Sequence, residues 1–88
     1  MSTNTRELVI SIPESILLAE KTNEIDFARE MQMLAAVKLF ELGRLSSGRA
    51  AQLAGVPRVE FLLSLKKYQV FPLADELNNL ETSYAQRN

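Results

Sequence analysis

Half of the ten basic side chains in this 88-residue sequence lie in one short segment, residues 44–67. The segment holds five basic residues against one acidic residue, Glu60, whereas the stretches before and after it are net acidic. Arginine and lysine bind phosphate oxygens, lysine as a point charge and arginine through a bidentate fork. The charge pattern therefore favours a phosphate-binding surface here, and a basic face that is only solvated is the alternative. The five basic residues are Arg44, Arg49, Arg58, Lys66 and Lys67.

Residues 46–67 have the spacing of a helix-turn-helix, and we expect this unit to position the basic side chains. Gly55 tolerates the positive φ of the turn, and small residues on both sides allow two short helices to cross closely. Such an arrangement commonly presents its second helix to DNA. The small residues are Ala50, Ala51 and Ala54, and Val56 and Phe61 are expected to fill the space between the helices.

The boundaries of this unit have local signals. Ser46 or Ser47 is expected to cap the first helix, since a hydroxyl can accept a hydrogen bond from a free N–H of the first turn. Leu53 is expected to face the core. Pro57 starts the second helix after a turn over residues 54–56, because its φ is already helical and it lacks the N–H that would go unpaired.

In a DNA-reading helix the early exposed positions face the base edges, and Arg58 is the one obvious reader among them because arginine can bind guanine through two hydrogen bonds. The other candidates there are apolar: Pro57, Val59, Leu62 and Leu63 could contact thymine methyls or pack against protein. Arg49, Lys66 and Lys67 are then contacts to the DNA backbone. The predicted DNA-binding residues are Ser47, Arg49, Arg58, Lys66 and Lys67.

The composition argues against several other functions. The chain has no Cys and no His, which removes disulfides, thiolate metal sites and the usual imidazole base, so we expect no enzyme, no metal and no cofactor. No apolar run approaches the ~20 residues that span a bilayer, and the polar start MSTNTRE lacks the features of a signal peptide. The sequence predicts a soluble, cytoplasmic protein of one domain, residues 1–88. A chain of this length buries only about 60–65% of its unfolded surface, so we also expect a homodimer.

Residues 7–12 alternate in polarity and predict a short, half-buried β-strand. Leu8, Ile10 and Ile12 fall on one face, and Glu7, Val9 and Ser11 on the other. A single strand needs a partner, which is either the β-like run at residues 70–73 or the same strand of a second copy. The order of strand, short helix and longer helix resembles the ribbon-helix-helix dimers, whose paired strands enter the major groove. The polar face of this strand offers little for base reading, so it suits dimerisation better.

Two helices are expected before the basic segment. Pro13 and Glu14 favour a short helix over residues 13–21, and Asn23 is a good N-cap for a longer one over residues 24–42, ended by Gly43. The longer helix carries two apolar stripes, so we expect it to pack on two neighbours, either within one chain or partly on a dimer mate. One stripe is Phe27, Met31, Leu34 and Leu42, and the other is Met33, Val37 and Phe40.

A tail helix is expected over residues 73–86, because apolar residues recur there at offsets of 4, 3 and 4. This face either completes the protein's own core or binds another protein. Its residues, predicted as partner-binding, are Leu73, Leu77, Leu80 and Tyr84.

Most of residues 7–73 resemble a prokaryotic, UPF-type family of small uncharacterised helix-turn-helix proteins. The resemblance is carried by an Ile-Pro-Glu step after the strand, a Gly-Arg-Leu-Ser joint, a Gly-Arg-Ala-Ala-x-Leu-Ala-Gly helix and a final x-Glu-Phe-Leu helix. Here these are Ile12-Pro13-Glu14, Gly43-Arg44-Leu45-Ser46, Gly48-Arg49-Ala50-Ala51-Gln52-Leu53-Ala54-Gly55 and Val59-Glu60-Phe61-Leu62.

The resemblance implies an antitoxin or small regulator that binds its own promoter and a PIN-domain ribonuclease toxin, with no catalytic residues. The tail departs from the family pattern, because a run of Phe71, Pro72 and Leu73 stands where relatives have a short strand and a strongly acidic end. The sequence thus predicts a mainly α-helical, dimeric fold with a helix-turn-helix core and a short N-terminal β-strand. Its predicted function is an operator-binding transcriptional regulator of antitoxin type, and the alternative is a protein-protein interaction module that does not bind DNA.

Overall fold

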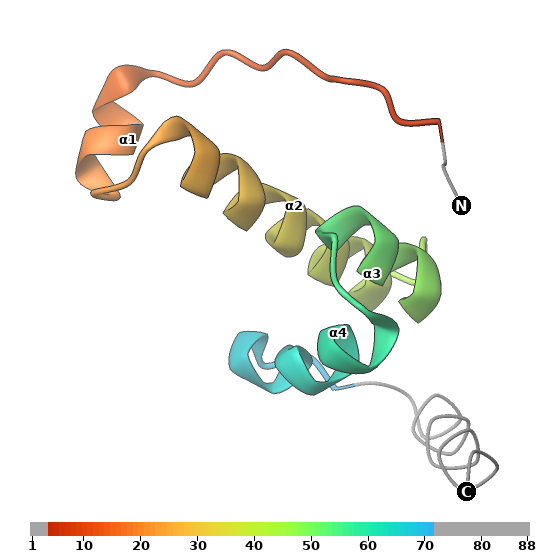
Figure 1. Ribbon diagram of the computed structural model, residues 1–88. Coiled ribbons are helices and arrows are strands. Elements are labelled where there is room, and N and C mark those ends of the chain that lie inside the picture. The colour runs from red at the N-terminus through yellow and green to blue at the C-terminus, as the bar shows by residue number, and fades with distance from the viewer. Residues whose placement is uncertain (1–3, 72–88) are drawn as a thin grey trace, which may run out of the picture.

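The computed structural model describes residues 4–71, and all of the regular structure within them is helical (Figure 1). Four α-helices are followed by a short 3-10 helix: α1 Glu14–Ala19, α2 Glu24–Glu41, α3 Ser47–Ala54, α4 Arg58–Ser64 and η1 Leu65–Tyr68. The prediction of a mainly α-helical fold is confirmed for this part of the chain. The predicted tail helix, with Leu73, Leu77, Leu80 and Tyr84, lies outside the described residues. No helix within residues 4–71 combines the length and the apolar character needed to cross a membrane.

Helix α2 begins and ends at the residues that the sequence marks. The Asn23 side chain accepts a hydrogen bond from the backbone N–H of Asp26 at 2.9 Å, as an N-cap should. Leu42 caps the other end, and Gly43 follows with a φ of +77°, a conformation that costs glycine little. Helix α1 is shorter than expected and ends at Ala19, two residues before Lys21, whose φ is +54°.

The core lies where α3, α4 and η1 meet the C-terminal half of α2 (Figure 1). Phe61 of α4 is fully buried, and its ring meets the ring of Phe40 of α2 edge to face, with centroids 5.7 Å apart. The Gln32 side chain also ties α2 to the end of α3, because its Nε2 donates to the carbonyl oxygen of Leu53 at 3.2 Å. The buried apolar residues are Ala36, Val37, Ala50, Ala51, Phe61, Leu62, Leu65 and Val70.

The two apolar stripes of α2 have different surroundings. In the stripe that faces the core, Val37 is buried and Met33 and Phe40 pack against the buried cluster. In the other stripe, Leu34 and Leu42 remain 46% and 57% exposed, while Phe27 and Met31 are only half-buried. Within residues 4–71, α2 therefore has one well-covered face and one that is largely uncovered.

The predicted strand over residues 7–12 is not formed within the described chain. These residues are extended but belong to no strand, and no backbone hydrogen bond holds them to the rest of residues 4–71. Leu8 and Val9 are 83% and 99% exposed. The proposed partner at residue 70 is not available, since Val70 is buried and its N–H donates to the carbonyl of Leu65 at 3.1 Å. A strand needs a second strand, and the described chain offers none.

Candidate nucleic-acid interface

Two short helices and the tight turn between them form the candidate site, and we call this unit the α3–α4 pair (residues 47–64). Ser46, rather than Ser47, is the N-cap of α3, where its hydroxyl accepts a hydrogen bond from the N–H of Arg49 at 3.2 Å. Gly55 ends α3 with a φ of +76°. The next residue, Val56, donates its N–H to the carbonyl of Ala51 at 3.1 Å, as in a Schellman motif.

Close packing holds the α3–α4 pair in one arrangement. Ala50 and Ala51 are 0% and 2% exposed, so the small face of α3 lies inside the protein as its composition predicts. Phe61 fills the interior beside them, and Val56 packs on the same cluster from the turn. Interiors of this density fix the relative position of the helices. The surface of α4 is thereby presented at a defined angle.

The structure brings together two of the predicted site residues, Ser47 and Arg58. Arg58 Nε donates a hydrogen bond to Ser47 Oγ at 2.7 Å, and Ser47 is only 2% exposed. The Arg58 side chain is itself half-buried. Ser47 is therefore placed to orient the guanidinium, a role that sequence reasoning missed when it treated the two residues as separate DNA contacts. Direct contact of Ser47 with DNA stays a prediction.

The remaining predicted basic residues are exposed on the surface of α3 and η1. Arg49 is exposed in the first turn of α3, and Lys66 and Lys67 are exposed on η1, directly after α4. Lys67 Nζ also lies 5.6 Å from the ring centroid of Tyr68, a cation–π distance. These side chains are thus accessible to phosphate groups, as a DNA-backbone contact requires.

The face of α4 differs from the prediction at one position. Leu62, expected to face the base edges, is only 5% exposed and belongs to the core. Its neighbour Leu63 is 72% exposed, and Val59 is half-buried. The reason is the helical period: Phe61, Leu62 and Leu65 share the inward side of this segment. The exposed side chains of α4 are Glu60 and Leu63, while Arg58 and Val59 are half-buried.

Residues 1–82 match the family described as "Uncharacterised protein family (UPF0175)". The chain belongs to the UPF0175 family. The UPF0175 protein of Aeropyrum pernix is 42% identical over 53 residues, which are 58% of this chain and 67% of the relative. No solved structure matches the chain.

The predicted resemblance to a UPF-type family of uncharacterised proteins is confirmed by this match to UPF0175. The helix-turn-helix character and the association with toxins stay predictions, because the family's description mentions neither.

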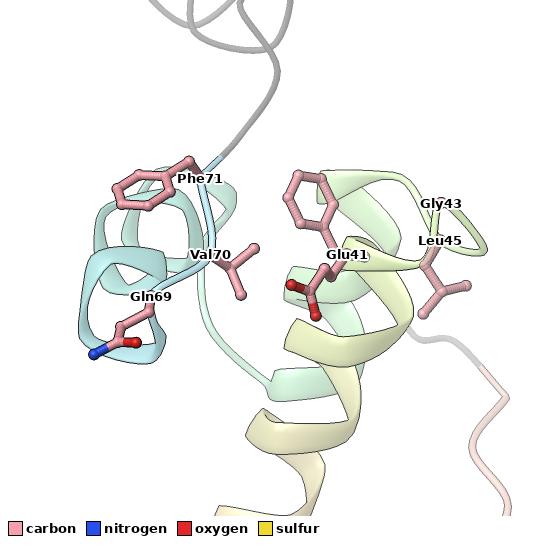
Figure 2. A pocket seen from close by; sticks show the side chains of 7 residues that line it. Glu41, Gly43, Leu45, Gln69, Val70 and Phe71 are labelled. Atoms are coloured by element: carbon pink, nitrogen blue, oxygen red, sulfur yellow. The ribbon is translucent and has the colours of Figure 1, made fainter.

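This UPF0175 chain also has a cavity that the sequence did not predict. It measures about 380 Å³ and lies between the C-terminal end of α2 and the segment that follows η1. Glu41 and Val70 point toward one another across it, and Gln69 and Phe71 lie on the side of Val70 (Figure 2). Its walls are mostly apolar, and residues 4–71 contain no group of three or more acidic side chains that could hold a metal ion. The cavity therefore shows no chemistry of its own.

Proposed function

We propose that this UPF0175 protein is a DNA-binding transcriptional regulator that uses α4 as its reading helix. The observation that carries the proposal is the α3–α4 pair itself: two short helices, a left-handed Gly55 between them and a buried Phe61 on the inner side of α4. Two short helices joined by a tight turn support this proposal, because helix-turn-helix proteins use such a unit to place a second helix in the major groove. The net charge of +4 over residues 44–67 agrees with it.

In this proposal the Ser47–Arg58 bond sets the direction of the reading side chain. Arg58 stands at the first position of α4, where a recognition helix contacts base edges. Arg49, Lys66 and Lys67 are exposed and bind phosphates on either side. Arg58 would then determine which sequence is bound, and the other three residues would contribute affinity to any duplex.

The DNA site follows from symmetry if the protein acts as a homodimer. Two copies of α4 in successive major grooves require an operator that is roughly palindromic, with half-sites about 34 Å apart. If each protomer makes ~4 phosphate contacts, log K falls against log salt with a slope near −7. A dimer of this kind would bind upstream of its own gene and repress it.

The antitoxin role is a second part of the proposal and rests on the resemblance that the sequence carries. In this role the protein also binds a PIN-domain ribonuclease toxin through the apolar face of its tail, which lies outside the described residues. Co-expression with a neighbouring ribonuclease gene and purification through a tag on this chain tests that part. A stable complex supports the antitoxin role, and its absence leaves a regulator without a toxin.

One observation favours the alternative, an interaction module that does not bind DNA. Leu63 lies 72% exposed on the outward face of α4, next to the half-buried Val59, and an apolar surface of this kind also suits a protein partner. The two functions respond differently to salt, because a hydrophobic interface is nearly indifferent to it and a DNA complex is not.

The experiment that separates them is fluorescence anisotropy with a duplex from upstream of the gene and a scrambled duplex, across a salt series. Preferential binding to the upstream duplex that weakens steeply with salt supports the regulator. Equal binding to both duplexes, or no binding at low salt, contradicts it and favours the interaction module.

A further inference from the structure

The N-terminal arm, residues 4–12, is an extended segment that runs clear of the helices (Figure 1). Within residues 4–71 its backbone makes no hydrogen bond to any other part of the chain. Leu8, Val9 and Ile10 are 83%, 99% and 59% exposed, so three consecutive large aliphatic side chains face water. An extended apolar segment with unpaired N–H and C=O groups is a template for pairing with another strand.

The described chain itself cannot supply that strand. Every regular element in residues 4–71 is a helix whose backbone hydrogen bonds are internal, and Val70 uses its N–H within the turn after η1. The arm is also short: Pro13 follows Ile12 at once and has no N–H to give to a ladder. The partner must therefore offer a short extended strand that matches residues 8–12.

We propose that the arm pairs with the same arm of a second copy of this chain, as an antiparallel two-stranded ribbon about a two-fold axis at Ile10. Such an interface is isologous, because each copy offers the surface that the other needs. The inference deepens the proposed function, since it supplies the interface of the dimer that presents two α4 helices to DNA.

The side chains select one register. With Ile10 opposite the partner's Ile10, Leu8 lies opposite the partner's Ile12, and all the aliphatic residues of one face oppose one another. The same register brings Arg6 toward the start of the partner's α1, where Glu14 carries the opposite charge. Pro13 then falls just beyond the ladder at both ends, where its missing N–H costs nothing.

Other registers pair the aliphatic side chains of the two arms less well. A shift of one residue places Ile10 of one copy on the same face as the polar residues of the other. A shift by two residues in one direction sets Ile12 opposite the partner's Arg6, and in the other direction leaves Leu8 beyond the partner's Pro13, where the ladder has ended. In each case an aliphatic side chain loses its apolar partner.

The aliphatic face of the ribbon also needs cover, because a two-stranded ribbon alone is marginally stable. The uncovered stripe of α2, with Met31 half-buried and Leu34 46% exposed, is the matching apolar surface. Pairing of the arms and covering of this stripe are therefore two parts of one dimer interface.

The test compares two isoleucine variants in DNA-free protein, so that it reads the dimer independently of DNA binding. Ile10→Asp puts two carboxylates face to face at the axis, and Ile25→Asp changes an isoleucine of α2 that is 68% exposed. Sedimentation equilibrium should give a dimer of the 9.9 kDa chain for wild type and for Ile25→Asp. For Ile10→Asp the dimer dissociation constant should rise about 100-fold. Circular dichroism should find both variants folded, since the arm makes no core contact.

The register is tested by single cysteines, which the natural sequence lacks. Under mild oxidation Ile10→Cys should form a disulfide-linked dimer, whereas Leu8→Cys and Ile12→Cys should cross-link only when the two variants are mixed. A monomeric wild type overturns the proposal. So does a dimer that survives Ile10→Asp but dissociates with Ile25→Asp, or cross-linking of Leu8→Cys to itself as readily as Ile10→Cys.

Discussion

Arg58 Nε donates a 2.7 Å hydrogen bond to Ser47 Oγ, and this bond joins the first residue of α4 to the first residue of α3. Ser47 is buried and belongs to a helix packed on α2, so its hydroxyl is a fixed acceptor. A side chain anchored in this way loses little further freedom when it binds a ligand, which favours specific contacts over adaptable ones. The bond thus supports the proposal that Arg58 reads the DNA sequence.

Replacement of Arg58 by alanine is expected to reduce the preference for the upstream duplex by about 1–3 kcal/mol, roughly 5- to 150-fold, because a bidentate contact to guanine carries that much discrimination. Ser47→Ala keeps the charge of Arg58 but removes the 2.7 Å hydrogen bond to its Nε, so it should lose part of this preference with little change in affinity for scrambled DNA. Anisotropy with both duplexes measures each effect. If Arg58→Ala discriminates as well as wild type, the role assigned to Arg58 is wrong.

Lys66 and Lys67 should behave differently, as contacts to phosphate. Alanine at either position is expected to weaken binding to the upstream and the scrambled duplex alike. It should also reduce the slope of log K against log salt by about 1. Lys38→Ala is the matched control, because Lys38 is an exposed lysine of α2 that is paired with Glu41 at 3.0 Å and is not among the predicted DNA contacts. A change in sequence preference with Lys66→Ala would contradict this division of roles.

The turn of the α3–α4 pair depends on one glycine. Gly55 has a φ of +76° and open space where a Cβ would stand, so Gly55→Ala should cost about 1–2 kcal/mol of unfolding free energy through backbone conformation alone. Gly48 lies within α3 without a positive φ and has equally open space, so Gly48→Ala should stabilise by about 0.5–1 kcal/mol. Urea denaturation of the two variants gives both values. Equal changes in the free energy of unfolding at the two sites would mean that the positive φ of Gly55 does not cause the loss of stability in Gly55→Ala.

Two adjacent leucines test the orientation of α4. Leu62 is 5% exposed and lies in the core, so Leu62→Ala should cost about 2–5 kcal/mol. Leu63 is 72% exposed, so Leu63→Ala should change stability by less than about 0.5 kcal/mol. Thermal or urea unfolding distinguishes them. The reverse order would show that α4 is rotated from the orientation described.

The helix boundaries that the sequence predicts correctly depend on residues at or near those boundaries. Asn23 and Gly43 bound α2, and Ser46 and Gly55 bound α3, because caps act through hydrogen bonds and backbone angles within a few residues. The second helix was expected to run on to Lys67, but α4 ends at Ser64 and continues as the 3-10 helix η1. There Ser64 Oγ donates to the carbonyl of Phe61 at 2.7 Å, a competing bond that helix periodicity does not reveal.

Features that depend on contacts between distant segments could not be predicted from the sequence. The alternation of residues 7–12 is real, but a strand also needs a neighbour, which a pattern in one segment cannot supply. The exposure of Leu62 was misjudged because its environment depends on how α4 packs on α2 and α3. The Ser47–Arg58 bond spans eleven residues and joins two helix starts, so it follows from the crossing of α3 and α4 and not from either helix alone.

Two-dimensional ¹⁵N NMR of the labelled protein during titration with the upstream duplex shows whether the α3–α4 pair binds DNA. Amide signals at residues 47–49, 58–60 and 66–67 are expected to shift with the upstream duplex and to shift less with a scrambled one, while those of α1 stay in place. Shifts confined to residues 7–12 would make the arm the DNA-binding element. They would contradict DNA binding by the α3–α4 pair, as would a spectrum that no duplex changes.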